Sequence, residues 1–252
     1  MILSSIRGDF IGGTIDLFSL YWPLLLQGLY ITLLLSFLGT FLGLIAASFL
    51  VALKTQENTY NQTLPMRFFS LLSKQLASVY VTIFRGTPMI VQAMVLYYGL
   101  ARLGVRLPIL VAGLLVVSLN TAAYITEILR SGLEALNKGQ SEAALSLGLS
   151  PRQTYWFIRF PQAFKNMIPA IGNELIVNIK DTAVLSVIGV GELFYTARGV
   201  AGSHWRYTET FFLVAMIYLL VVMIAVYGLK MLSTYLGKSP KDILRSESEA
   251  PL

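Results

Sequence analysis

The stretch WPLLLQGLYITLLLSFLGTFLGLIAASFLVAL, from Trp22 to Leu53, decides the fold class because it contains no charged residue. The uncharged region extends further, because no charged residue occurs between Asp16 and Lys54. About 20 apolar residues are enough for a helix to cross the roughly 30 Å hydrocarbon core of a membrane. Backbone groups in that core must be hydrogen-bonded within the segment, which favours a helix. The sequence therefore predicts a first transmembrane helix within residues 22–53.

Four more segments of suitable length and hydrophobicity follow this one. We predict spans at about Leu76–Leu100, Leu107–Thr126 with a helix continuing to Arg130, Met167–Val190 and Thr210–Leu229. Of all residues, 56% are hydrophobic and only 13% are charged, whereas soluble domains have about a quarter charged residues. The chain is therefore predicted to be an all-α membrane protein, a bundle of five transmembrane helices. The connection after the fourth span, which carries Arg198 and His204, is expected to be a loop.

Basic residues are distributed unequally between the two sides that five spans create. If the N-terminus is outside, twelve Lys and Arg residues lie in inner segments and five in outer segments, with Arg85 and Lys180 inside spans. Cytoplasmic segments carry such an excess. We therefore predict an external N-terminus and a cytoplasmic C-terminus in a cell membrane. The predicted parts are an external segment over residues 1–21, a transmembrane domain over 22–235 and a cytoplasmic tail over 236–252.

Composition also excludes several classes of protein. There is no cysteine and a single histidine, His204, so thiolate and multi-histidine metal sites are excluded. The net charge of +6 comes from basic residues beside the spans, which suits a membrane surface better than nucleic acid. No removable signal peptide is expected, because the first residues lack a clean apolar segment with a cleavage site.

A long polar segment, about residues 131–165, separates the third and fourth spans and contains SEAALSLGLSPRQTYWFIRFP. Ala143 and Ala144 are strong helix formers with small side chains, which allow a helix to pack closely against a partner. Glu142 is expected near the N-terminus of that helix, where the helix dipole favours a carboxylate. The segment therefore predicts a cytoplasmic docking helix.

Gly148 is followed by Ser150 and Pro151, a combination typical of a helix end and a turn. The segment resembles the cytoplasmic loop of ABC importer permeases, which reads EAA, three residues, G, nine residues, I, one residue, LP. The chain matches this spacing, with Phe160 where the family prefers Leu. In the family this loop forms a coupling helix that sits in a groove of the ATPase subunit. The resemblance implies ATPase-coupling roles for Glu142, Ala143, Ala144 and Gly148.

Three other segments are similar to the polar amino acid branch of that family. They are FRGTPMIVQ (Phe84–Gln92), NTAAYITEILRSG (Asn120–Gly132) and KDTAVLSVIGVGEL (Lys180–Leu193). The resemblance implies a permease that is not itself an enzyme and has no cofactor of its own. It implies an ATPase subunit dimer that holds ATP and magnesium, a second permease subunit, an external solute-binding protein and an amino-acid substrate. A Walker A motif is not expected here, since Leu232 stands where the glycine five residues before Gly237 is required.

Charged residues inside the predicted spans are candidates for the solute path, because such residues usually face an aqueous cavity or the bundle interior. Arg85 lies about mid-depth in the second span, beside Pro88, which permits a helix break. Asn120, Tyr124 and Glu127 share one helical face, as do Glu174, Asn178 and Asp181. We predict that the solute-binding residues are Arg85, Asn120, Lys180 and Asp181, which converge on one water-accessible cavity near mid-depth, and Glu127 and Thr182, which lie closer to its rim.

Two kinds of alternative remain open from the residues alone. In the first, the charges form structural ion pairs: Arg85 with Asp181 or Glu174, Glu127 with Arg130, and Lys180 with Asp181. In the second, the chain is an ABC permease for another solute, such as methionine or a quaternary amine, or a self-contained channel or secondary transporter. An intramembrane enzyme is disfavoured, because no HExxH, GxSxG or facing aspartate pair occurs in the sequence.

Overall fold

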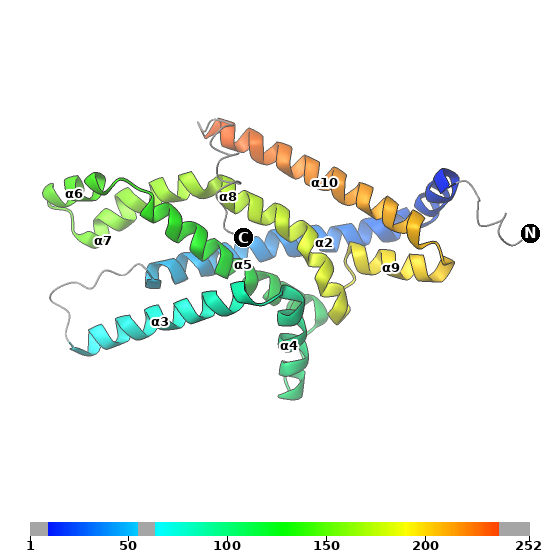
Figure 1. The fold of residues 1–252 in the computed structure, drawn as a ribbon, viewed down its shortest axis with the longest axis horizontal. Coiled ribbons are helices and arrows are strands. Elements are labelled where there is room, and N and C mark those ends of the chain that lie inside the picture. Colours follow the sequence, from blue (N-terminus) through cyan, green and yellow to red (C-terminus); the bar gives the residue numbers. More distant parts are fainter. Residues whose placement is uncertain (1–9, 55–63, 237–252) are drawn as a thin grey trace, which may run out of the picture. The chain divides into compact units, whose positions relative to one another are not determined.

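The computed structural model describes residues 10–54 and 64–236, and these are almost entirely helical, with no β-strand in either range (Figure 1). Residues 1–9, 55–63 and 237–252, which include most of the predicted cytoplasmic tail, lie outside the described ranges. The elements in chain order are α2 (Phe10–Lys54), α3 (Leu64–Gly86), α4 (Met89–Arg102), α5 (Ile109–Glu134), α6 (Lys138–Ser146), α7 (Pro151–Gln153), the π-helix η1 (Thr154–Arg159), α8 (Phe160–Asp181), the 3-10 helix η2 (Thr182–Ile188), α9 (Leu193–His204) and α10 (Tyr207–Tyr235).

Within the described ranges, α2, α5 and α10 are each long and apolar enough to cross a membrane. The number rises to five when two pairs of helices joined through a bend each count as one span. These pairs contain α3 with α4, and the run from α7 to η2 with α9. The predicted all-α membrane bundle is therefore confirmed, and the five predicted spans correspond in order to these five segments.

The second predicted span is not a continuous helix. The chain leaves the helical path at Thr87 and Pro88, between α3 and α4. Pro88 has no backbone N–H to donate and its ring clashes with the preceding turn, so the break expected at this proline is confirmed. The helix also begins earlier than predicted, at Leu64. Its first turns carry the exposed side chains of Phe68 and Phe69.

The loop predicted after the fourth span is wrong, because residues 193–204 form the helix α9. The cause is a local cap that hydrophobicity does not reveal. The Glu192 side chain accepts hydrogen bonds from the backbone N–H groups of Tyr195 at 2.6 Å and Phe194 at 2.8 Å. These N–H groups have no partner within the helix itself, so the cap stabilises its first turn. The Tyr218 hydroxyl donates a third hydrogen bond to this fully buried carboxylate.

The described chain forms two compact units, each with its own core. The first comprises, among the described residues, 10–39, 89–117 and 176–226. One of its clusters packs Leu35 of α2 against Val116 of α5 and Leu185 of η2. A second cluster joins Leu25 of α2 to Leu193 of α9 and to Val214 of α10. Apolar side chains from distant parts of the sequence therefore hold this unit together.

The second unit comprises, among the described residues, 40–54, 64–88, 118–175 and 227–236. Its core packs Val51 of α2 against Ile125 and Leu129 of α5 and Ala163 of α8. The Met167 side chain of α8 packs over Gly132 of α5, where a Cβ would lie 1.7 Å from the Met167 methyl carbon. Small residues allow this kind of helix contact where lipid provides no hydrophobic drive for association.

Candidate functional site

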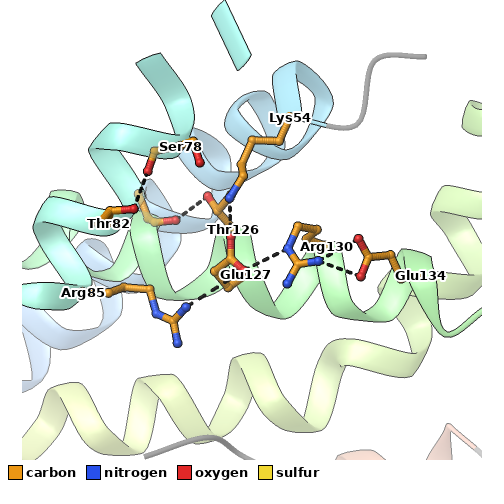
Figure 2. Close-up of polar contacts among 9 residues, drawn as sticks. Lys54, Ser78, Thr82, Arg85, Thr126, Glu127, Arg130 and Glu134 are labelled. Atoms are coloured by element: carbon orange, nitrogen blue, oxygen red, sulfur yellow. Dashed lines mark hydrogen bonds and ion pairs between the residues drawn. The ribbon is translucent and has the colours of Figure 1, made fainter. Parts of the chain in front are cut away.

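Glu127 of α5 is the centre of a charge cluster within the second unit (Figure 2). Its carboxylate lies 2.5 Å from the Lys54 ammonium at the end of α2 and 2.9 Å from Nε of Arg130. Arg130 also binds Glu134 at 2.6 Å, one helical turn further along α5. The Glu127 side chain is only 16% exposed, so these partners offset the cost of removing its charge from water.

Arg85, the penultimate residue of α3, is the third cation beside Glu127 and the one held least tightly. Its Nη1 lies 4.0 Å from the Glu127 carboxylate, which is beyond hydrogen-bonding distance. Its guanidinium stacks over the Tyr124 ring at 5.5 Å from the centroid, a favourable cation–π arrangement. Among the described residues, no hydrogen bond reaches this guanidinium. Arg85 is therefore held in place while its five N–H donors stay available.

The cluster has more positive than negative charge. Lys54, Arg85 and Arg130 face the carboxylates of Glu127 and Glu134, which leaves one positive charge in excess. The side chain of Arg85 is 33% exposed, so an outside group can reach it. Guanidinium groups bind carboxylates through two parallel hydrogen bonds. The arrangement is therefore suited to receive one carboxylate at Arg85.

The prediction from sequence placed Arg85, Asn120 and Glu127 at one site. The structure brings Arg85 and Glu127 together and places both beside Tyr124, which was predicted to share the Glu127 face. The predicted local pair of Glu127 with Arg130 is confirmed. Within the second unit, the Glu127 carboxylate faces Arg85. Asn120 is buried in α5.

The other three predicted solute-binding residues lie in the first unit, at the junction of α8 and η2. Lys180 and Asp181 are exposed. Thr182 is fully buried, and its hydroxyl donates to the backbone carbonyl of Ile179 at 3.2 Å. The Thr182 hydroxyl is therefore used by its own helix, whereas the two charged side chains are accessible.

Sequence reasoning missed Lys54 as a member of the cluster. It appears in the sequence as an ordinary basic residue at the inner end of the first span. The available signal was that Lys54 and Glu127 both stand near the predicted inner ends of long apolar segments. Pairing them requires the register of α2 against α5. That register is set by packing of residues such as Val51 against Ile125.

The predicted docking helix is α6, a second feature of the same unit. It begins at Lys138, where the side chain of the preceding Asn137 accepts a hydrogen bond from the Gly139 N–H at 2.9 Å. Glu142 therefore lies in the second turn of α6. The sequence had predicted it nearer to the N-terminus of the helix. Glu142 and Ala143 are exposed, while Ala144 is buried. Since α6 packs against η1, we assign Ala144 to packing within the loop.

Gly148 ends this helical region in the left-handed conformation, with φ at +86°. That conformation costs a residue with a Cβ about 1–2 kcal/mol. Two residues later Ser150 caps α7: its hydroxyl accepts from the Gln153 N–H, and its own N–H donates to the Gln153 side chain. This reciprocal capping box and Pro151 in the first turn start the next helix directly. The predicted turn is thus confirmed.

The turn exposes apolar side chains that the polar character of this segment did not predict. Leu147 is 83% exposed, and Leu145 is exposed on the same short segment. Figure 1 places α6 and α7 next to each other, with the turn between them. Large apolar groups projecting from a defined turn are typical of a binding surface.

Comparison with known proteins gives a consistent match along most of the chain. Residues 63–233 match the model of the family described as binding-protein-dependent transport system inner membrane component. The chain is 35% identical to the arginine transport system permease protein ArtQ of Bacillus subtilis (strain 168), over 89% of this chain and 94% of that protein. It is 32% identical to the glutamine transport system permease protein GlnP of Escherichia coli (strain K12), over 83% of this chain and 91% of that protein.

A solved structure shows the same likeness in three dimensions. The crystal structure of an amino acid ABC transporter with histidines superposes with a TM-score of 0.79. Its chain is 33% identical to this one, and the match covers 90% of this chain and 99% of that chain. The likeness therefore extends over both described units.

Proposed function

The chain belongs to the family of binding-protein-dependent transport system inner membrane components, and on this premise we propose that it is the permease subunit of an ATP-binding-cassette importer for polar amino acids. It is a multi-pass protein of the cell membrane. The observation that carries the proposal is the match over 89% of the chain to a relative named as an arginine permease. The other amino acid relatives support the same solute class.

The α6–α7 turn is the proposed contact with the ATPase. Exposed Glu142, Ala143 and Leu147 would enter a groove of the partner, and Gly148 would set the direction of the chain between the two helices. Members of this family work with an ATPase and a solute-binding protein. We assign ATP and magnesium to a dimer of ATPase subunits. A second permease subunit, identical or homologous, completes the assembly.

Arg85 is the proposed ligand for the solute carboxylate. Every free amino acid carries that group. A unit charge pair 4 Å apart attracts by roughly 4 kcal/mol at an effective dielectric constant of about 20, and a hydrogen-bonded carboxylate attracts more strongly. A solute carboxylate would therefore occupy the donors that Glu127 leaves open at 4.0 Å. We also propose that exposed Lys180 and Asp181 contact the solute, and that Asn120 and Thr182 contribute to solute binding.

The proposed topology places the N-terminus outside and the α6–α7 turn in the cytoplasm. Ser146 at the end of α6 and Ser203 near the end of α9 are both exposed, so cysteines introduced there can be labelled. We expect a membrane-impermeant maleimide added to intact cells to label Ser203→Cys and not Ser146→Cys. Permeabilised cells serve as the control, in which both should react. Labelling of Ser146→Cys from outside would contradict the topology.

The solute class is tested by ATPase stimulation in liposomes that contain the whole importer. A panel of polar amino acids, each loaded on the solute-binding protein, is compared with methionine and a quaternary amine. We expect at least one polar amino acid to stimulate hydrolysis and the two alternatives to leave it at the basal rate. If only methionine or the quaternary amine stimulated ATP hydrolysis, the proposed solute class would be wrong, while the role as a permease subunit would stand.

A further inference from the structure

A groove of about 410 Å³ lies within the first unit, between α2 and the segment that contains α9. Its walls include Leu24 and Ile31 on α2 and Thr196 and Val200 on α9. The two helices touch beside it, where a Cβ on Gly28 would lie 2.8 Å from the Thr196 hydroxyl oxygen. Exposed Leu24 shows that the groove opens to the surface of the unit.

Two glycines create the space. Gly191 and Gly199 line the groove, and a Cβ built on either would meet no atom within 4 Å. Close packing therefore does not explain why these positions lack a side chain. A larger residue at either position would project into the groove without disturbing the fold. The cavity thus depends on the absence of two side chains.

The lining of the groove is apolar and neutral. None of the described residues that line it carries a charged side chain. Its polar groups are hydroxyls and one amide, on residues such as Gln27, Thr196 and Ser203. The neighbouring carboxylate of Glu192 is fully buried and accepts three hydrogen bonds. A free amino acid, with its two charges, would find no counter-charge here, which excludes it on energetic grounds.

The dimensions of the groove select among neutral occupants. It follows α2 from Tyr21 to Ile31, which is about 15 Å at 1.5 Å per residue. That length equals half of the roughly 30 Å hydrocarbon core, or the depth of one leaflet. A groove of this length with a volume of about 410 Å³ suits one extended alkyl chain that lies along α2.

We propose that this groove binds one acyl chain of a membrane phospholipid. The chain would lie along α2 and α9, with its terminal methyl group toward Ile31 and Gly191 and its ester end toward Tyr21 and Ser203. At that end the Tyr21 hydroxyl contacts the His204 ring, which supplies polar groups at the level of the headgroup. Both helices belong to segments that can span a membrane, and in this proposal the open side of the groove faces lipid.

Photocrosslinking tests this proposal with the complete importer in vesicles of phosphatidylethanolamine and phosphatidylglycerol. A trace phospholipid carries a diazirine on its acyl chain, and labelled peptides are identified by mass spectrometry. Gly199→Leu and Gly191→Leu each fill the groove. Gly228→Leu is the matched control, because Gly228 is an exposed position on α10 where a Cβ also meets nothing within 4 Å.

We expect strong labelling of residues 21–31 and 193–204 in the unmodified protein. Each filling variant should lower that labelling by about tenfold or more, the ratio that corresponds to ~1.4 kcal/mol, while Gly228→Leu leaves it unchanged. Thermal melting of each variant confirms that it is folded. Equal labelling of the groove in the unmodified protein and both filling variants would overturn the proposal. The proposal would also be overturned if a free amino acid removed the label from the groove and excess phospholipid did not.

Discussion

Arg85→Ala is expected to abolish uptake of every solute that the importer carries. The variant removes the guanidinium that is proposed to hold the carboxylate common to all amino acids. Losing a charge-assisted bidentate contact in a partly buried site costs about 2–5 kcal/mol, so uptake at low solute concentration should fall at least about thirtyfold. The measurement is initial uptake of radiolabelled amino acid into proteoliposomes over a range of solute concentrations.

Two controls separate solute binding from a structural role for Arg85. Arg102→Ala removes an exposed arginine at the end of α4 and should leave uptake unchanged. Arg85→Lys keeps the charge but loses the planar pair of donors, so KM should rise while the maximum rate is kept. A fall in melting temperature of Arg85→Ala, with KM unaltered, would make Arg85 a structural partner of Glu127. Unchanged uptake would remove it from the path altogether.

Glu127→Gln extends the same experiment to solute charge. The variant removes the carboxylate shared by Lys54, Arg85 and Arg130, so the site becomes more positive. Cationic solutes should therefore lose uptake most, while neutral solutes lose less. Equal loss for cationic and neutral solutes would show that Glu127 acts by holding the three helices in place and not by selecting charge.

Gly148→Val is expected to stop transport while the protein still inserts into the membrane. A Cβ at this position meets no atom within 4 Å, so steric crowding does not enter. The effect comes from the backbone, whose φ of +86° costs a residue with a Cβ about 1–2 kcal/mol, and more for a β-branched residue. The turn should adopt another conformation and move Leu147 and Glu142 away from the partner. Solute-stimulated ATP hydrolysis and uptake are measured together.

Gly148→Asn is the matched control, because asparagine enters the left-handed region far more readily than valine. It should retain most of the transport activity and of the ATPase binding. Uptake by Gly148→Val at the unmodified rate would show that this turn is not needed for coupling. Loss of the Gly148→Val protein from the membrane fraction would instead assign the glycine to folding.

Local signals in the sequence were sufficient for much of the fold. Long uncharged segments predicted the spans, Pro88 predicted the break after α3, and Gly148 with Ser150 predicted the turn after α6. Each of these depends on a few consecutive residues whose backbone preferences are strong. The helix α9 was missed because its start depends on Glu192. That residue caps a helix in a fully buried setting that composition does not disclose.

The candidate site was harder to predict, for a related reason. A helical face could be assigned to Tyr124 and Glu127 from their spacing alone. The partners of Glu127 on other helices could not be identified from spacing. Lys54 and Arg85 reach Glu127 only through the packing of α2 and α3 on α5. The excess of positive charge in this cluster is a property of that assembly. The groove beside Gly199 has the same origin, since it requires α2 to lie against α9.

ATP dependence of uptake tests the central claim most directly. Proteoliposomes are prepared with this chain alone, and with this chain together with its ATPase subunit and solute-binding protein. Uptake of a radiolabelled polar amino acid is then followed with ATP, with a non-hydrolysable analogue and without nucleotide. We predict uptake only in the complete assembly with hydrolysable ATP. Accumulation or equilibration of the amino acid by this chain alone would contradict the account and identify a self-contained channel or secondary transporter.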